Sequence, residues 1–284
     1  FGKTPPCADL IIQHKISKVV IGSKDPFQEV NGKGIEKLKA AGVEVISGIL
    51  ENECKALNKR FFTFHEKKRP YVILKWAQTA DGKMASLNPS AGGTSDSDRK
   101  RLFISNEYSN RLVHQWRSEE ASILIGTNTA LLDDPELTNR LWEGNSPIRL
   151  VLDMDLRLPS HLKLFDKKVK TIVFNAVKQE EKENLIYYKI DKEKSIVSEI
   201  SYALYQLNIQ SVIVEGGAKL LQSFIDAGLW DEARVISNEK LVINNACLPD
   251  RQGLAAPNLT AALMVKEEKI LSDRIEYYTR TNTE

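Results

Sequence analysis

Cysteine and histidine are scarce in this chain, and both are scattered along it. The three cysteines among 284 residues are Cys7, Cys54 and Cys247, an odd number of widely separated thiols. Such usage argues against a disulfide framework and fits a reducing compartment, so we expect a cytoplasmic protein. The four histidines show no spacing typical of metal ligands, which argues against a metal site built on them.

Long apolar runs and an excess of charge are also missing. No run approaches the roughly 20 residues that a transmembrane helix needs, and no signal peptide is visible. The net charge is only +2, with acids and bases interspersed, which argues against a nucleic-acid footprint or a membrane-surface patch. The 42% of hydrophobic residues suffices for a packed core in one large or two ordinary domains.

The first residues carry a fragment of a metal-site pattern. Pro5-Pro6-Cys7 leads into the apolar segment Leu10–Ile12, and a Pro-Cys pair entering a helix supplies a late zinc ligand in nucleobase deaminases. The other ligands and the catalytic Glu would lie upstream. Because the chain does not begin with Met, we expect a fragment or a processed product. A lone Cys is more often a small apolar residue, and that alternative stays open.

The alternation of apolar and turn-forming segments predicts parallel α/β structure throughout. In residues 1–66 we expect a helix from Ala8 to about His14, a strand at Val19–Ile21, a helix through Ile35 and Leu38 that stops at Gly42, and a strand at Val43–Ile46. The basic stretch 67–70 reads as a linker, so we place the domain boundary there, between 1–66 and 67–284.

Residues 71–280 continue the alternation. We expect strands at Tyr71–Trp76, Ser122–Ile125, Arg149–Leu152, Thr171–Phe174, Ser211–Val214 and Ala233–Ile236, and an antiparallel edge strand at Ile275–Thr279. Helical stripes run through Tyr108, Leu112 and Trp116 with Ser105 as N-cap, through Ile196, Ile200, Ala203, Leu204 and Leu207, and through Leu220, Leu221, Phe224 and Ile225 up to Gly228.

The segment 212–217 combines a strand, a glutamate and two glycines. Glu215-Gly216-Gly217 lies directly before a helix that begins at Ala218. Glycines let the backbone approach a phosphate, and the free N–H groups and dipole of the helix favour negative charge. The segment therefore suits a dinucleotide phosphate, although it is not the G-x-G-x-x-G fingerprint. A tight strand-to-helix turn explains it equally well.

A second polar segment, residues 126–140, follows the strand that ends at Ile125. Ligands of open α/β sheets bind at the carboxyl ends of strands. Thr127, Thr129 and Asp133 suit ribose hydroxyls, and Arg140, with Arg117 upstream, suits a phosphate. The alternative is a capped, turn-rich loop with solvated arginines.

Lys75 lies within an otherwise apolar strand, followed by a turn at Asp81-Gly82. A buried ammonium group needs a partner. Lys75 therefore either faces a ligand or lies on an edge strand and reaches solvent.

Four short segments occur in the order typical of one family. They are Gly-Lys-Thr-Pro-Pro-Cys at 2–7, Lys-Trp-Ala-Gln-Thr-Ala-Asp-Gly at 75–82, Leu-Leu-Asp-Asp-Pro-Glu-Leu-Thr at 131–138 and Val-Glu-Gly-Gly at 214–217. On these segments the chain resembles the bifunctional riboflavin-biosynthesis deaminase-reductases over nearly its whole length. Each segment is modest alone, but their common order makes the match specific.

The resemblance implies a fold and two activities. Residues 1–66 would be the C-terminal part of a cytidine-deaminase-like zinc domain, and 67–284 a dihydrofolate-reductase-like α/β domain. The family's reductase uses NADPH to reduce 5-amino-6-(5-phosphoribosylamino)uracil to the 5-phosphoribitylamino product. Pyrimidine deamination would belong to the full-length protein and be lost in this fragment. The partner would be a small phosphorylated pyrimidine, and a homodimer would fit the family.

The resemblance also assigns residues to roles. Lys75 would lie beside the substrate ribose, and Cys7 would be the last zinc ligand of the full-length protein. We expect Glu215 or Lys75 to be the catalytic group that delivers a proton as the substrate is reduced, and the choice between them stays open. The cofactor would contact Ala77, Phe103, Thr129, Asp133, Gly216, Gly217, Ala218, Lys219 and Leu220. The substrate would contact Arg101, Arg117, Leu137, Arg140 and Glu215, with Arg117 and Arg140 facing its phosphate.

Three departures from the family pattern support a second interpretation of the chain. Phe103 stands where many members have Trp, and Met154 follows Asp153 where Ser is common, which removes one cofactor hydrogen bond. Residues 247–252 look like an insertion. The rival is a dihydrofolate-reductase-like module that binds a dinucleotide with altered or no reductase activity.

Overall fold

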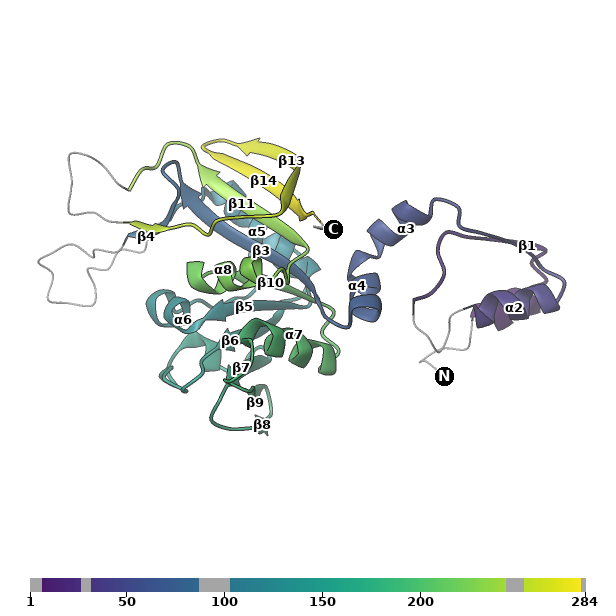
Figure 1. The fold of residues 1–284 in the computed structure, drawn as a ribbon, viewed down its shortest axis with the longest axis horizontal. Coiled ribbons are helices and arrows are strands. Elements are labelled where there is room, and N and C mark those ends of the chain that lie inside the picture. Colours follow the sequence, from purple (N-terminus) through teal and green to yellow (C-terminus); the bar gives the residue numbers. More distant parts are fainter. Residues whose placement is uncertain (1–6, 27–31, 87–102, 244–252, 282–284) are drawn as a thin grey trace, which may run out of the picture. The chain divides into compact units, whose positions relative to one another are not determined.

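The computed structural model describes residues 7–26, 32–86, 103–243 and 253–281 (Figure 1). The chain divides into two compact units, Phe1–Pro70 and Tyr71–Glu284. The division falls at the end of the basic stretch 67–70. None of the helices in these ranges is long and apolar enough to cross a membrane.

The first unit is small and mainly helical. Its elements are α1 (Cys7–Gln13), β1 (Lys18–Ile21), α2 (Lys33–Ala40), β2 (Glu44–Ser47), α3 (Glu51–Leu57) and α4 (Lys59–Lys67). Strands β1 and β2 pair in parallel, as the order of helix, glycine and strand predicts. Gly42, two residues after the end of α2, has φ +80°, a left-handed conformation that glycine adopts without strain. Ala8, Leu38 and Val43 form one buried cluster of this unit, and Phe62 and Phe64 of α4 are also buried.

The second unit is built on a sheet that has ten strands within the described residues. Its order is β13-β14-β11-β3-β10-β5-β6-β7-β9-β8. The strands from β11 to β9 run parallel: β3 (Tyr71–Thr79), β5 (Ser122–Gly126), β6 (Ile148–Leu152), β7 (Thr171–Asn175), β9 (Leu185–Lys189), β10 (Ser211–Glu215) and β11 (Glu232–Asn238). Strands β8 (Glu180–Lys182), β13 (Ala262–Ile270) and β14 (Asp273–Arg280) are antiparallel to their neighbours. A separate pair is formed by β4 (Lys83–Ser86) and β12 (Gly253–Ala255).

All six predicted inner strands are present, and each extends beyond its predicted apolar run, by one residue in β5, β6, β7 and β10 and by three in β3 and β11. The strand expected at Ile275–Thr279 is antiparallel, but the prediction that it lies at the edge is wrong. It is flanked by β11 and β13, and β13 forms the edge. The charged run Lys266–Lys269 gives β13 no apolar alternation, because both faces of this strand are largely exposed.

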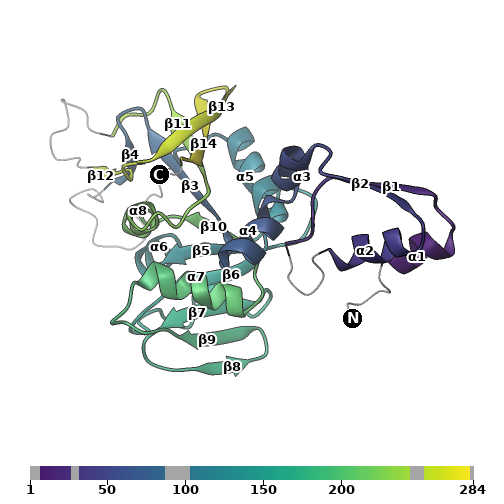
Figure 2. The same cartoon turned by 45° about the vertical axis from the view of Figure 1, so that its right-hand side comes forward.

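Helices cover both faces of the sheet (Figure 2). On one face, α7 (Ile196–Gln206) and α8 (Ala218–Asp226) pack on alternate residues of the inner strands, Val72 and Val212 among them. On the other face lie α5 (Glu107–Glu119) and α6 (Thr127–Asp133), with a short 3-10 turn at Lys163–Phe165. Because successive side chains of a strand point to opposite faces, the continuous apolar strands fill two cores.

Helix α5 begins one residue later than predicted. Its N-cap is Asn106, not Ser105, and the Asn106 side chain accepts hydrogen bonds from the backbone N–H groups of Tyr108 and Ser109, each at 3.0 Å. The buried stripe passes through Ser109, Val113 and Trp116, whereas Tyr108 is 56% exposed. The stripe predicted for α8 is confirmed, and Gly228 follows it at φ +62°.

Candidate active site

Strands β3 and β10 bring two ionisable side chains together near the carboxyl edge of the sheet. Lys75 and Glu215 are register partners on adjacent parallel strands, so their side chains share one face. Arg117, in the last turn of α5, reaches them from that face. Because β3 is an inner strand, the alternative that Lys75 lies at an edge is wrong.

Glu215 is held by two cations. Arg117 donates from Nε to Oε1 at 3.1 Å and from Nη2 to Oε2 at 2.7 Å. Lys75 Nζ lies 3.9 Å from Oε2, and the three side chains are between 10% and 14% exposed. A bidentate guanidinium–carboxylate pair fixes both groups in orientation as well as in charge.

The charge state of Glu215 follows from this surrounding. Burial acts to raise its pKa, but Arg117 and Lys75 outweigh burial and lower the pKa to about 2. The carboxylate is therefore ionised at neutral pH, where it can accept a hydrogen bond but has no proton to donate.

Helix α5 also contacts the polar loop that follows α6. Arg117 Nη1 donates to the carbonyl oxygen of Thr138 at 3.3 Å. One turn earlier, Nδ1 of His114 accepts the backbone N–H of Arg140 at 2.9 Å. His114 is 2% exposed, and burial is the main reason that its pKa falls to about 4. His114 is not among the predicted site residues; the only sequence signal for it is its i, i+3 spacing from Arg117.

The two predicted substrate contacts in this loop, Arg140 and Leu137, differ in exposure. Arg140 extends into solvent, with its side chain 49% exposed, and bonds Glu136 at 3.0 Å and the hydroxyl of Thr138 at 2.7 Å. Leu137 has φ +52° and packs in the core with Ile125. A ligand could therefore contact Leu137 only through its backbone.

The two glycines after Glu215 adopt the left-handed backbone that only glycine takes without strain. Gly216 has φ +100° and Gly217 φ +69°. A Cβ on Gly216 would lie 3.2 Å from Cγ2 of Thr129, and one on Gly217 would lie 3.5 Å from its hydroxyl. The start of α8 and the Thr129 side chain of α6 are thus adjacent at the ends of neighbouring strands. A glycine backbone that leads into a helix N-terminus suits the phosphates of a dinucleotide.

The remaining predicted cofactor contacts vary in exposure. Ala77 lies two residues after Lys75 on the same face of β3 and is half-buried. Phe103 is 78% exposed, and Asp133 and Lys219 are also exposed. Leu220 is buried in the core beneath α8, so only its backbone N–H could reach a ligand. Arg101 and the insertion at 247–252 lie outside the described residues.

Cys7 begins α1 and is exposed. In the described ranges, no group of three or more His, Cys, Asp and Glu side chains could hold a metal ion. Catalytic zinc usually has three protein ligands. These residues therefore do not fit the zinc centre of a deaminase.

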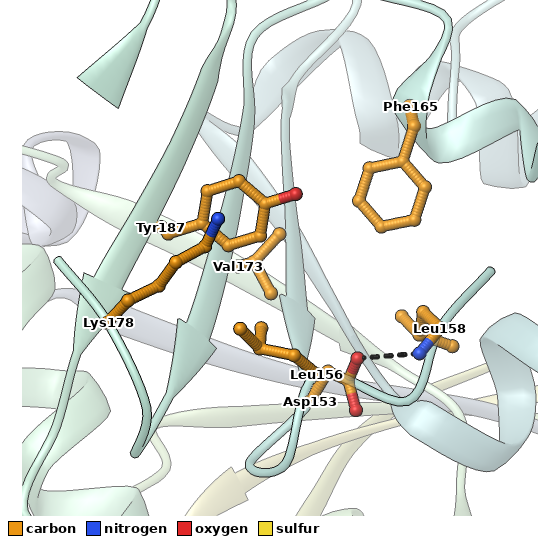
Figure 3. Close-up of a pocket in the computed structure, with 7 residues that line it drawn as sticks. All are labelled: Asp153, Leu156, Leu158, Phe165, Val173, Lys178 and Tyr187. Carbon is orange, nitrogen blue, oxygen red and sulfur yellow. Dashed lines mark hydrogen bonds between the residues drawn. The ribbon is translucent and has the colours of Figure 1, made fainter. Parts of the chain in front are cut away.

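A cavity of about 180 Å³ lies elsewhere in the second unit, beside β6, β7 and β9 (Figure 3). Its lining residues are Asp153, Leu156, Leu158, Phe165, Val173, Lys178 and Tyr187. Asp153 accepts the backbone N–H of Leu158 at 2.9 Å, and Lys178 Nζ lies 3.8 Å from the centre of the Tyr187 ring. Strand β5 separates this region from Lys75 and Glu215, and no predicted site residue lines the cavity.

Comparison with known proteins identifies relatives along almost the whole chain. The family model described as "RibD C-terminal domain" matches residues 70–267. The riboflavin biosynthesis protein RibD of Aquifex aeolicus is 35% identical over 281 residues, which cover 95% of this chain and 74% of that protein. RibD of Actinobacillus pleuropneumoniae is 34% identical, with 85% of this chain and 64% of that protein covered. The chain therefore spans less than two thirds of the Actinobacillus relative.

A solved structure shares the fold. The diaminohydroxyphosphoribosylaminopyrimidine deaminase/5-amino-6-(5-phosphoribosylamino)uracil reductase of Thermotoga maritima superposes with a TM-score of 0.81 at 33% identity. The superposition covers 99% of this chain and 76% of that chain. The predicted α/β fold class is confirmed.

Proposed function

Because the chain belongs to the RibD family of riboflavin biosynthesis proteins and carries that family's C-terminal domain, we propose that its second unit is an NADPH-dependent reductase. The proposed substrate is 5-amino-6-(5-phosphoribosylamino)uracil, and the product is its 5-phosphoribitylamino form. The observation that carries the proposal is the Lys75–Glu215–Arg117 cluster directly beside the open glycine turn at 216–217.

The glycine turn supports a dinucleotide. We assign the cofactor phosphates to the backbone N–H groups from Gly216 to Leu220, where the first turn of α8 offers donors without intrahelical partners. Thr129 adds a hydroxyl at the same place, and Ala77, Phe103 and Asp133 are further proposed contacts. When bound, the nicotinamide group supplies the hydride.

The cluster supports a division of labour in proton transfer. Glu215 is ionised with a pKa of about 2 and has no proton to give. We therefore propose that the ammonium group of Lys75 donates the proton that the substrate takes up during reduction. Glu215 keeps that ammonium group in place, and its own orientation is fixed by the two hydrogen bonds from Arg117.

We assign the substrate phosphate to Arg140, with Arg117 behind it. Arg140 is the more exposed of the two, and a guanidinium group offers a planar fork of donors to a phosphate. Anchoring the phosphate holds the ribose at a fixed distance from Lys75, which lowers the entropic part of the barrier.

A rival function, dinucleotide binding without reduction, is favoured by one observation. Met154, which stands where the family commonly has Ser, packs against the core and offers no hydroxyl. Steady-state assays separate the two functions. The reductase oxidises NADPH only when the pyrimidine substrate is present, whereas the rival binds NADPH and leaves it unoxidised.

We also propose a homodimer formed through β13. This edge strand exposes Leu263, Met264 and Val265 at 58%, 49% and 55% of their surfaces. Exposed apolar edge strands pair readily with another chain. Sedimentation of the wild type and of a Val265→Lys variant tests this. We expect the wild type to be a dimer and the variant a monomer. A monomeric wild type contradicts the proposal.

A further inference from the structure

Helix α5 ties the loop carrying Arg140 to the candidate site at two points. His114 and Arg117 are three residues apart, so they share one face of the helix. The loop accepts a hydrogen bond from Arg117 at the Thr138 carbonyl, 3.3 Å away, and donates one from the Arg140 N–H to His114, 2.9 Å away. The backbone on both sides of Asn139 is therefore fixed to the helix that also orients Glu215.

The hydrogen bond at His114 determines its tautomer. Because Nδ1 accepts a hydrogen bond from the Arg140 N–H, the neutral ring carries its proton on Nε2. Burial, followed by the nearby Arg117 and Arg140, lowers the pKa of His114 to about 4, while Glu215 acts in the opposite direction. A protonated ring would lose the acceptor and place a third positive charge beside two arginines.

We propose that His114 is a positioning residue: through its Nδ1 it fixes the Arg140 backbone and thereby sets where the Arg140 guanidinium meets the phosphate of the substrate. The inference rests on the proposed function, which makes Arg140 the phosphate anchor. The half-exposed side chain of Arg140 extends from this fixed backbone, and its guanidinium is held by Glu136 and the hydroxyl of Thr138 in the same loop. Helix α5 thus fixes the position of Arg140 relative to Lys75 and Glu215.

Two substitutions separate positioning from core filling. His114→Asn keeps a hydrogen-bond acceptor near the position of Nδ1, whereas His114→Leu fills a similar volume without one. We expect His114→Leu to weaken binding of ribose 5-phosphate, measured by calorimetry, about tenfold. His114→Asn stays within about threefold of wild type. His161→Leu, at an exposed histidine, is the matched control and binds as wild type.

Kinetics give the second readout. His114→Leu should raise KM for the phosphorylated substrate about tenfold, with kcat and the KM for NADPH close to wild type. The KM for the dephosphorylated substrate should not change, because the effect acts through the phosphate. Equal losses with both substrates, or a fall in kcat alone, overturn the proposal.

A nitrogen-15 NMR measurement on the wild type keeps the inference testable even where His114→Leu does not fold. The expected tautomer carries its proton on Nε2, and a proton on Nδ1 overturns the proposal. Failure of the proposed function gives a different result. In that case ribose 5-phosphate binding still depends on His114, but no variant, wild type included, oxidises NADPH.

Discussion

The residue that best defines the chemistry of this site is Glu215, because its charge is set by its neighbours. Its carboxylate is held by Arg117 through two hydrogen bonds and lies 3.9 Å from Lys75. Removing the negative charge leaves two cations together in a largely buried place. Breaking one partner out of a buried ion pair is more costly than the pair is stabilising.

We therefore expect Glu215→Gln to lower the free energy of unfolding by about 3 kcal/mol at neutral pH. The pKa of Glu215 falls on folding from its ordinary value of 4.5 to about 2. A depressed pKa contributes stability above pH 4.5 that is lost as the pH falls towards 2. In urea unfolding, the difference in unfolding free energy between wild type and variant should therefore shrink as the pH is lowered. A difference that does not depend on pH contradicts the lowered pKa of Glu215.

Arg140 provides a second test at the residue scale. Losing charge-assisted hydrogen bonds to a phosphate costs about 2 kcal/mol. Arg140→Ala should therefore raise KM for the phosphorylated substrate about 30-fold while kcat changes little. Arg157, whose side chain is 65% exposed, offers a matched control, and Arg157→Ala should behave as wild type. An Arg140→Ala enzyme with wild-type KM shows that the phosphate lies elsewhere.

Some residues of the site could be named from the sequence, and others could not. Glu215 and its glycines stand out because a strand, a carboxylate and a helix start follow one another within a few positions. Lys75 was assigned by resemblance, and its register partnership with Glu215 depends on strand order, which no local pattern contains. His114 was missed because its partner is a backbone N–H in a distant loop.

At the scale of elements, the turn between β10 and α8 is constrained by two consecutive glycines with positive φ. Gly217 and Gly82 share a positive φ, +69° and +70°. Placing a Cβ at either costs about 1 kcal/mol of strain. Of these two glycines, Gly217 lies beside Thr129 in the proposed phosphate site and Gly82 does not.

We therefore expect Gly217→Ala and Gly82→Ala to lower the melting temperature by similar amounts. Gly217→Ala alone should weaken NADPH binding, by about tenfold, because its methyl group narrows the approach to the first N–H groups of α8. Fluorescence titration with NADPH measures the difference. Equal cofactor affinity in the two variants would move the phosphates away from this turn.

Some helices and strands could be predicted from the sequence pattern, and others could not. Inner parallel strands were predictable because burial on both faces demands continuous apolar runs. Strand β13 was missed because an edge strand exposes both faces and carries charges such as Lys266 and Glu267. The N-cap of α5 is Asn106 and not the predicted Ser105, because both side chain types can cap a helix and the sequence pattern does not separate two adjacent candidates.

At the scale of the whole molecule, the two units differ in how much they bury. The first unit has one small buried cluster, Ala8, Leu38 and Val43, besides the buried Phe62 and Phe64 of α4, and Val20 on its two-stranded sheet is 57% exposed. The second unit holds the three larger buried clusters on a sheet of ten strands within the described residues. Stability follows the amount of apolar surface buried, so the first unit should open first.

Limited proteolysis with trypsin tests this difference. We expect early cleavage at Lys67 and Lys68, which end α4, and a resistant fragment that begins near Tyr71. Mass spectrometry of the time course identifies the fragment. Equal protection of both units would show that their stabilities are matched.

The central claim is that the second unit transfers hydride to the ribosyl carbon C1′ of its pyrimidine substrate. The most direct measurement uses NADPH carrying deuterium at the transferred position, incubated with the protein and 5-amino-6-(5-phosphoribosylamino)uracil. The account predicts one deuterium per product molecule, located at C1′ of the new ribityl chain, with one NADPH oxidised per product. Bound NADPH that remains unoxidised, or a product without deuterium at C1′, would contradict it.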